Sequence, residues 1–362
     1  MNRSFIIEPA ADLVHFHSVF VPRQATLARE LRRLGIPYVV TPHGGLMPQV
    51  LERGKAKKLV YSAFVERERI RKASGIAYVT PDGEGDIRKY IGQFDGPVHW
   101  VPNPVNIGQL QAHSWQPDGA RPRLTFLGRY DVYHKGIDRL ANVAQRIIDA
   151  DFQLYGIRDQ KTSRYLDVLE EFGPPNFHVN SPIFGEEKLS ALSRSTMYVQ
   201  LSRWEALSIS ILEAMAIGVP CVIGEGMSMA SIFTTNDLGL VVSTNPDLAA
   251  RQILAALDQP EQLRAWSERS RAYVIENFLP ARVAERIITV YEEALDFYFS
   301  TGRGASFVTP IEGNGERSDP LTGFGNQHNQ KKRDSKNFEY LFDRRQRGIE
   351  QVVDTFAASD DA

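Results

Sequence analysis

The sequence predicts an α/β protein built from two doubly wound parallel sheets. Short apolar runs alternate with helical stretches along residues 1–104 and again along residues 123–280, and strands that alternate with helices form parallel sheets. Residues 105–122 are rich in proline, glycine and polar side chains, which is typical of a linker between domains. The length of 362 residues fits two domains of ordinary size.

The first domain is expected to contain four strands within residues 1–104. A helix at 25–35 lies between the first two strands and ends where Gly35 and Pro37 cannot continue it. A long charged helix is expected near 53–73. The expected strands are Leu13–Phe16, Tyr38–Thr41, Ile76–Thr80 and Val98–Val101.

The second domain is expected to contain a longer series of the same kind. In its helix at 247–257, we expect Leu254, Ala255 and Leu257 to face the core, and we expect the same of Trp266 in the next helix. The expected strands are 123–128, 151–156, 176–181, 197–202 and 220–224, and the expected helices are 136–149, 162–172, 186–194, 209–217, 247–257 and 260–277.

The C-terminal part of the chain changes character after one more amphipathic helix at 281–300. Residues 301–335 are polar, rich in glycine and poor in aliphatic side chains, which predicts a disordered linker. Residues 336–357 carry apolar side chains at helical spacing. Because a single helix cannot bury such a stripe, we expect it to dock on this chain or on a partner in a homo- or hetero-oligomer.

Composition and charge narrow the function classes. The formal net charge of −2 creates no global field that would favour nucleic acid. The opening residues lack the apolar core of a signal peptide, and no run of 18 apolar residues occurs, so the cytoplasm is the expected compartment. The basic stretch 54–72 fits peripheral contact with the inner membrane face, although a simply solvated helix explains it equally well. The single cysteine, Cys221, is expected to be buried.

The first chemical signal follows the first strand of the second domain. There Gly128 and Arg129 precede a short loop to Lys135, which stands before a helix. Ligands bind at the carboxyl ends of strands in such sheets. A guanidinium can bridge two phosphate oxygens while an ammonium acts as a point charge, so the two cations could clamp a diphosphate. Taken alone, the pattern fits a solvated turn at least as well.

The second signal is a pair of glutamates around a predicted helix start. Ser208 is a good N-cap, and the helix begins at Ile209, whose N–H group is free for a phosphate. Glu205 lies on the loop before the helix. Glu213 lies one turn inside it among apolar and small residues, where its two oxygens could accept the hydroxyls of a ribose.

Two aromatic side chains complete the candidate set. Phe184 lies in a turn after a strand and could pack beside a nucleobase, although a core position is the preferred interpretation. His43 lies beside two glycines, which allow a backbone to approach a ligand closely. We interpret His15 and His17, which alternate on a strand, as structural.

These segments together resemble the retaining GT-B glycosyltransferases of the large group 1 family (family 4 type). The residues that carry the resemblance are Gly128–Arg129 with Lys135–Gly136, Glu205 seven residues before Glu213-Ala214-Met215-Ala216, and the loop 41–45 with His43. The resemblance implies two Rossmann-like domains facing a cleft. It also implies a sugar-nucleotide donor, UDP- or GDP-linked, and a glycan or lipid-linked acceptor.

The resemblance also assigns roles. Arg129 and Lys135 should hold the donor diphosphate, with Ser208 and Ile209 near the phosphates. Glu213 should hold the ribose. Glu205 should face the reacting carbon, and His43 should lie near the donor sugar. It implies no resident cofactor, and the chain has no aspartate-x-aspartate motif, so we expect no essential metal.

The sequence departs from the family at two places. Ala206 follows the first glutamate, where the family has glycine. The segment 12–22 resembles roughly the fourth strand of the family, so the N-terminal domain is expected to be truncated, without the family's glycine-rich loop. The preferred function is a retaining glycosyltransferase, with bacterial surface polysaccharide assembly as the commonest setting. The alternative is a non-catalytic, sugar-nucleotide-binding partner subunit of a complete enzyme.

Overall fold

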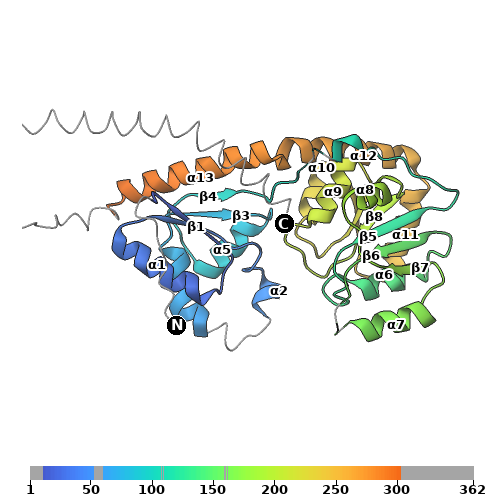
Figure 1. The fold of residues 1–362 in the computed structure, drawn as a ribbon, viewed down its shortest axis with the longest axis horizontal. Helices are drawn as coiled ribbons and strands as arrows, with labels where there is room; N and C mark the ends of the chain where they lie inside the picture. Colours follow the sequence, from blue (N-terminus) through green and yellow to red (C-terminus); the bar gives the residue numbers. More distant parts are fainter. Residues whose placement is uncertain are drawn as a thin grey trace, which may run out of the picture.

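The computed structural model of the chain contains two α/β lobes that lie side by side (Figure 1). It describes residues 11–52, 60–106, 108, 110–158, 160 and 162–302. The helix predicted at 336–357, and all but the first two residues of the linker predicted at 301–335, lie outside these ranges.

The N-terminal lobe contains a parallel sheet of four strands in the order β1-β2-β3-β4. The strands are β1 (Val14–His17), β2 (Tyr38–Thr41), β3 (Gly75–Tyr78) and β4 (Val98–Trp100). All four match the predicted strands to within a few residues. The order of the strands in the sheet is their order in the chain, so each described strand is added on the same side of the one before it.

The two faces of this sheet have different covers. In β2, Tyr38 and Val40 face a core shared with α1 (Pro22–Leu34), α4 (Arg67–Arg71) and α5 (Gly83–Ile91), whereas Val39 faces the other side. That other side packs against α13 (Pro280–Ser300), the last described helix. Alternate residues of a strand point to opposite faces, so both faces of β2 are apolar and all four of its residues are buried.

The C-terminal lobe contains a parallel sheet of six strands in the order β10-β9-β8-β5-β6-β7. The chain moves outward from β5 to β7 and then returns to build β8 to β10 on the other side of β5. Strand order therefore reverses between β5 and β8, and in such sheets the crevice for ligands lies at this switch point. The strands are β5 (Arg123–Leu127), β6 (Asp151–Tyr155), β7 (Phe177–Asn180), β8 (Met197–Gln200), β9 (Cys221–Gly224) and β10 (Gly239–Val242).

Helices cover both faces of this second sheet. One core contains side chains of α6 (Ile137–Ala144), α7 (Ser163–Phe172) and α11 (Pro246–Leu257). The other contains side chains of α8 (Gly185–Ser193), α9 (Ile209–Ile217) and α10 (Ala230–Asn236). The long helix α12 (Pro260–Phe278) contributes Trp266 to the first core and Phe278 to the second. Trp266 and Cys221 are buried, as predicted.

The chain crosses between the lobes twice. The first crossing follows β4 and continues through the segment that holds a short 3₁₀ helix, Leu110–Ala112. The second is the junction of α12 and α13, after which α13 runs along the N-terminal lobe (Figure 1). A hydrogen bond of 2.8 Å from the Val105 amide to the Phe278 carbonyl joins the two crossings.

The predicted fold class is confirmed, and three local predictions are wrong or incomplete. In α11 the buried residues are Ala249, Ala250, Ile253 and Ala256, whereas Leu254 and Ala255 are exposed and Leu257 is only partly buried. Three of these four buried residues are alanines, so the size of a side chain was a misleading guide to burial. The helices α5 and α10 have no counterpart among the predictions, and α6 is shorter than the predicted 136–149.

The basic stretch at 54–72 is less uniform than its composition suggests. Its described part forms a π-helical segment, Ser62–Glu66, followed by α4. Arg69 does not reach the surface, because it is buried against Glu66 and donates to the Ser18 carbonyl at 3.2 Å. Within the described ranges, no helix combines the length and apolarity needed to cross a bilayer.

Candidate functional site

The candidate residues of the C-terminal lobe gather at the switch point of its sheet. Gly128 and Arg129 directly follow β5, and Lys135 precedes α6. Glu205 lies on the loop between β8 and α9, and Ser208 and Ile209 form the start of α9. Because β5 and β8 are neighbours, both loops emerge at the same edge of the sheet.

An ion pair connects the two loops. The Lys135 ammonium donates to Oε2 of Glu205, and both side chains are largely buried, at 15% and 14% exposure. The same carboxylate oxygen accepts a hydrogen bond of 3.0 Å from the Gln200 amide at the end of β8. The sequence predicted both charged residues at the site but not that they pair with each other.

The loop that carries Lys135 is held in place by two further contacts. The ring of His134 stacks on Trp204, with centroids 4.5 Å apart. Gly136 has a φ of +68°, and a Cβ at this position would lie 2.1 Å from the Leu201 carbonyl oxygen. Only glycine fits there, which explains why glycine follows the lysine.

The start of α9 is open toward the crevice. Ser208 occupies the N-cap position, but its side chain makes no cap hydrogen bond and instead donates to the Gln200 amide oxygen at 2.9 Å. Ser210 bonds the Leu127 carbonyl at 3.2 Å, which ties the helix start to the end of β5. The backbone amides of Ile209 and Ser210 donate no hydrogen bond to the described part of the chain. Such free amides suit an anion.

Glu213 lies one turn further along α9 and pairs with a residue that the sequence did not suggest. Its Oε1 accepts a hydrogen bond of 2.7 Å from the Lys188 ammonium of α8. Lys188 also bonds, through its backbone amide, the carbonyl of Phe184. Phe184 is 68% exposed, so the expectation of a core position is wrong. Phe184 is the N-cap residue of α8, and because its ring is exposed, it can contact a ligand.

Arg129 lies just after β5 and is exposed. Its side chain makes no hydrogen bond or ion pair with the other described residues. A free guanidinium next to the Lys135 loop can close on a phosphate without first breaking a protein contact.

The N-terminal lobe contributes a cluster of three histidines. His43 has a positive φ of +47°, and its Nε2 lies 2.8 Å from Nδ1 of His17. The rings of His15 and His17 are tilted against each other with centroids 4.2 Å apart, and His15 also forms hydrogen bonds with Thr41 and Tyr291. His17 is therefore in direct contact with the candidate residue His43, which its placement on a strand did not reveal. A cavity of about 250 Å³ with mostly apolar walls opens beside the cluster.

These imidazoles are held in the neutral form. Burial, reinforced by the charges of His17 and His43, lowers the pKa of His15 to about 3. Burial and the neighbouring His17 lower the pKa of His43 to about 4. At neutral pH, His43 can therefore accept or donate a hydrogen bond without carrying charge.

The two lobes meet at the glycine that follows His43. Gly44 has a φ of +72°, and a Cβ at this position would lie 2.6 Å from Cβ of Ala206. This contact brings the His43 loop against the loop that carries Glu205. Ala206 is the residue that departs from the family pattern, and its methyl group lies against Gly44 of the N-terminal lobe.

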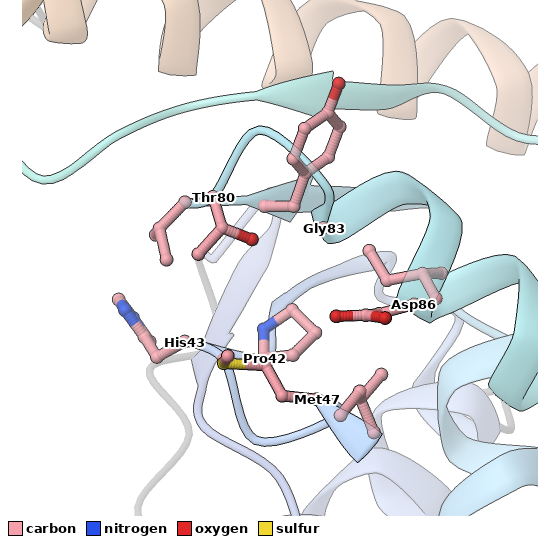
Figure 2. A pocket seen from close by; sticks show the side chains of 11 residues that line it. Pro42, His43, Met47, Thr80, Gly83 and Asp86 are labelled. Atoms are coloured by element: carbon pink, nitrogen blue, oxygen red, sulfur yellow. The ribbon is translucent and has the colours of Figure 1, made fainter. Parts of the chain in front are cut away.

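A small crevice lies on the N-terminal side of this contact (Figure 2). Thr80 and Asp86 stand on either side of the space above Pro42, with His43 at its outer edge. Burial raises the pKa of the Asp86 carboxyl. Neither Thr80 nor Asp86 was among the predicted site residues, because a threonine after a strand and an acid in the first turn of a helix are both common.

Comparison with known proteins gives the family. A family model described as "Glycosyl transferases group 1" matches residues 110–273, and one described as "Glycosyl transferase 4-like domain" matches residues 3–104. The chain belongs to the group 1 glycosyltransferases. The curated relatives of this glycosyltransferase are named as transferases and synthases, and the alternative of a non-catalytic partner subunit stays an untested prediction.

Two curated relatives show how far the likeness extends. Alpha-maltose-1-phosphate synthase of Mycolicibacterium smegmatis is 26% identical over 314 residues, which cover 78% of this chain and 79% of the relative. Phosphatidyl-myo-inositol mannosyltransferase of Propionibacterium freudenreichii is 31% identical over 224 residues, which cover 56% of this glycosyltransferase and 54% of the relative.

Solved structures confirm the GT-B architecture. Sucrose-phosphate synthase of Thermosynechococcus elongatus superposes with a TM-score of 0.65 at 19% identity, over 79% of this chain and 74% of that one. A UDP-forming α,α-trehalose-phosphate synthase of Burkholderia xenovorans gives a TM-score of 0.61 at 15% identity, over 80% and 75%. The roles assigned to individual site residues of this glycosyltransferase remain predictions.

Proposed function

We propose that this glycosyltransferase moves a sugar from a nucleoside-diphosphate sugar to a glycan or lipid-linked acceptor, with retention at the anomeric carbon. The observation that carries the proposal is the gathering of Arg129, Lys135 and the open start of α9 at the switch point of the C-terminal sheet. Cations and free amides fixed in this way stabilise the charge of a departing diphosphate.

Glu213 supports the assignment of a nucleoside to this diphosphate. It lies four residues after Ile209 and therefore on the same face of α9, one turn from the phosphate end. Its ion pair with Lys188 holds the partly buried carboxylate in a fixed orientation. On binding, a ribose would compete with the ammonium for the two carboxylate oxygens, while the exposed Phe184 ring could lie beside the base.

The ion pair of Glu205 supports retention without a protein nucleophile. Its carboxylate is bound by Lys135 and Gln200, which lowers its availability to attack a sugar carbon. The leaving phosphate itself can take the acceptor proton, and the neutral His43 can hydrogen-bond the donor sugar across the lobe contact. Proton transfer then needs no further side chain with a pKa near 7.

The direct experiment measures release of nucleoside diphosphate from a panel of UDP- and GDP-sugars, combined with thermal-shift binding. Lys135→Ala should lower turnover by about 10²–10³-fold, because it removes a fixed charge at the developing diphosphate. Glu213→Ala should mainly weaken donor binding. Glu187→Ala, an exposed acid on α8, is the matched control. Unchanged rates in both site variants would refute the assignment.

Retention is tested on the product. Proton NMR of a transferred sugar, or of the sugar released by hydrolysis, reports the configuration at the anomeric carbon before mutarotation. An inverted product would refute retention while leaving the donor site intact. Surface polysaccharide assembly is the setting that we propose for this reaction.

A further inference from the structure

Gln200, the last residue of β8, is a buried amide that connects two parts of the proposed donor site. Its Nε2 donates to Oε2 of Glu205 at 3.0 Å and to Oγ of Ser202 at 2.9 Å. Its Oε1 accepts from the Ser208 hydroxyl at 2.9 Å and lies 3.0 Å from the Tyr198 hydroxyl, which can also donate to it. The side chain is 0% exposed, so the protein itself satisfies both ends of this amide.

The orientation of the Gln200 amide is fixed by its neighbours. The Glu205 carboxylate only accepts hydrogen bonds, so the NH₂ end must face Glu205 and the oxygen end must face Ser208. Lys135 donates to the same carboxylate oxygen, Oε2. The other oxygen, Oε1, makes no hydrogen bond with the described residues, so it is available to a bound ligand.

The oxygen end of the amide affects what the start of α9 offers to a ligand. Ser208 has a φ of −86° and a ψ of 115°, the extended backbone of an N-cap residue whose side chain can cap a helix. Its hydroxyl nevertheless points to Gln200, and the amides of Ser210 and Ile211 donate no hydrogen bond to the described residues. Without Gln200, the hydroxyl could turn and accept from one of these amides. Gln200 therefore holds a capping side chain away from amides that suit an anion.

We propose that Gln200 is a positioning residue of the donor site. One end of its amide holds the Glu205 carboxylate with one oxygen free for the donor sugar. The other end keeps the first turn of α9 open for the diphosphate. This inference rests on the proposed function, and it assigns Gln200 no contact with the substrate, because the residue acts through Glu205 and Ser208.

The first experiment uses Gln200→Met, which keeps the length of the side chain and removes its amide. Release of nucleoside diphosphate from UDP- and GDP-sugars gives kcat and KM, and calorimetry gives the affinities for UDP and GDP alone. The variant should lower kcat by about 10–100-fold, because Glu205 is no longer held in place. It should weaken nucleotide binding by about fivefold, because the Ser208 hydroxyl competes for the amides of α9. An unchanged kcat or an unchanged affinity would overturn the inference.

Thr125→Val is the matched control for the loss of a buried hydrogen bond. Thr125 is 0% exposed on β5, the strand next to β8, and its hydroxyl lies 2.6 Å from that of Ser195. This variant should lower the free energy of unfolding but leave kcat and nucleotide affinity unchanged. Equal losses of kcat in Thr125→Val and Gln200→Met would mean that Gln200 acts only through stability, and the inference would then be wrong.

Gln200→Glu provides a signature that a merely structural role would not produce. A protonated glutamic acid can donate to Glu205 through one oxygen and accept from Ser208 through the other, as the amide does. An ionised one repels the Glu205 carboxylate, which favours a shared proton. The kcat of this variant relative to wild type should therefore rise at least about tenfold as the pH falls from about 8 to about 5.5. A ratio that is constant or falls would contradict positioning through the amide.

Other titratable groups near Gln200 do not obscure this signature. They are the Lys135 ammonium, His134, Tyr198 and Cys221. Burial raises the pKa of Tyr198 and the pKa of Cys221, so both stay neutral over this range. Burial lowers the pKa of His134, and dividing by the wild-type rate at each pH removes its titration, because both proteins contain it.

Hydrogen exchange tests the inference without a substrate. In Gln200→Met, the amides of Ser210 and Ile211 should exchange about fivefold more slowly, because the Ser208 hydroxyl can cap them. If wild type turns over no sugar nucleotide but this protection appears, the role of Gln200 at α9 stands and the transfer reaction does not. If wild type hydrolyses donors and Gln200→Met changes neither kcat nor this exchange, the donor site stands and the role of Gln200 is wrong.

Discussion

The two lobes are both parallel sheets covered by helices, yet they build their functional surfaces differently. In the C-terminal lobe, strand order reverses between β5 and β8, and the charged residues stand on the two loops beside this reversal. In the N-terminal lobe, the described strands follow one another in chain order. Its polar side chains instead gather through contacts between distant segments, such as His17 with His43 and His15 with Tyr291.

The difference explains which residues a sequence reveals. Where strand order creates a crevice, the ligand-binding side chains lie next to a strand end or a helix start. Such residues occur at characteristic separations in the sequence, as Lys135, Glu205 and Glu213 do. Side chains that meet through contacts between distant segments have no characteristic separation in the sequence. The following predictions test this contrast, from the largest effect on stability or turnover to the smallest.

The largest expected effect compares two ion pairs. Glu66 and Arg69 of the N-terminal lobe are 0% and 2% exposed, whereas Asp138 and Arg203 of the C-terminal lobe are 27% and 19% exposed. Arg69→Met should cost about 3–5 kcal/mol, because it leaves a carboxylate buried without a counter-charge. Arg203→Met should cost about 1 kcal/mol. Urea unfolding, followed by hydrogen exchange in each lobe, measures the loss of unfolding free energy in both variants. Equal losses in Arg69→Met and Arg203→Met would contradict the expected difference between the lobes.

The second prediction concerns the contact between the lobes. Gly44→Ala should lower turnover by about 10–100-fold, because the added methyl pushes against Ala206 and displaces the reacting groups. Gly35→Ala is the matched control: its φ of +70° imposes similar strain, but its Cβ would meet only the Tyr298 hydroxyl at 3.9 Å. The double variant with Ala206→Gly should recover part of the turnover. Equal turnover in the two single variants would show that the contact is unimportant.

The third prediction concerns pH. The folded pKa values of His15 and His43, about 3 and about 4, lie below the ordinary value of 6.5, and burial also lowers the pKa of His17. Below pH 6.5 the unfolded chain binds protons that the folded lobe excludes. Stability is therefore fully present above pH 6.5 and is lost as pH falls toward 4 and then 3.

Thermal unfolding measured across this range checks the prediction. His15→Leu should flatten the dependence on pH, because it removes the most strongly shifted of the three groups. The C-terminal lobe has one such group in the described residues, His134, whose pKa burial also lowers. A steeper loss of protection in the C-terminal lobe than in the N-terminal lobe would contradict the contrast.

The smallest effect compares two helix starts of the C-terminal lobe. The Asn245 side chain caps α11 by accepting from the amides of Asp247 and Leu248, whereas Ser208 leaves α9 uncapped. Asn245→Ala should cost about 1 kcal/mol in unfolding free energy without changing turnover. Ser208→Ala should reduce donor turnover more than stability. The reverse pattern would mean that the open start of α9 has no role with the donor.

Much of the fold follows from the alternation of apolar runs and helices. Every predicted strand is present, from β2, whose four residues are all buried, to β4, whose three residues are only partly buried. The burial pattern of α11 was not predictable from size, because the face that is buried carries Ala249, Ile253 and Ala256 at helical spacing, and Leu254 lies one position off that face. The helix α5 was missed because its sequence, GEGDIRKYI, contains two glycines and four acids or bases before its apolar end.

The site was predictable to a similar extent. Lys135, Glu205 and Glu213 were found by their spacing, and the structure adds their partners Gln200 and Lys188. No local pattern could indicate that Lys188 meets Glu213, 25 residues away, or that Gly44 meets Ala206 in the other lobe. That Thr80 and Asp86 lie at one crevice beside Pro42 became evident only from the structure.

The helix α13 determines how the molecule can bend. It begins directly after α12 of the C-terminal lobe but packs along the N-terminal sheet, and the Val105–Phe278 hydrogen bond places the other chain crossing beside its first residues. Both connections therefore pass through one narrow hinge. A change in the angle between the lobes would therefore have to bend both chain crossings at this one place.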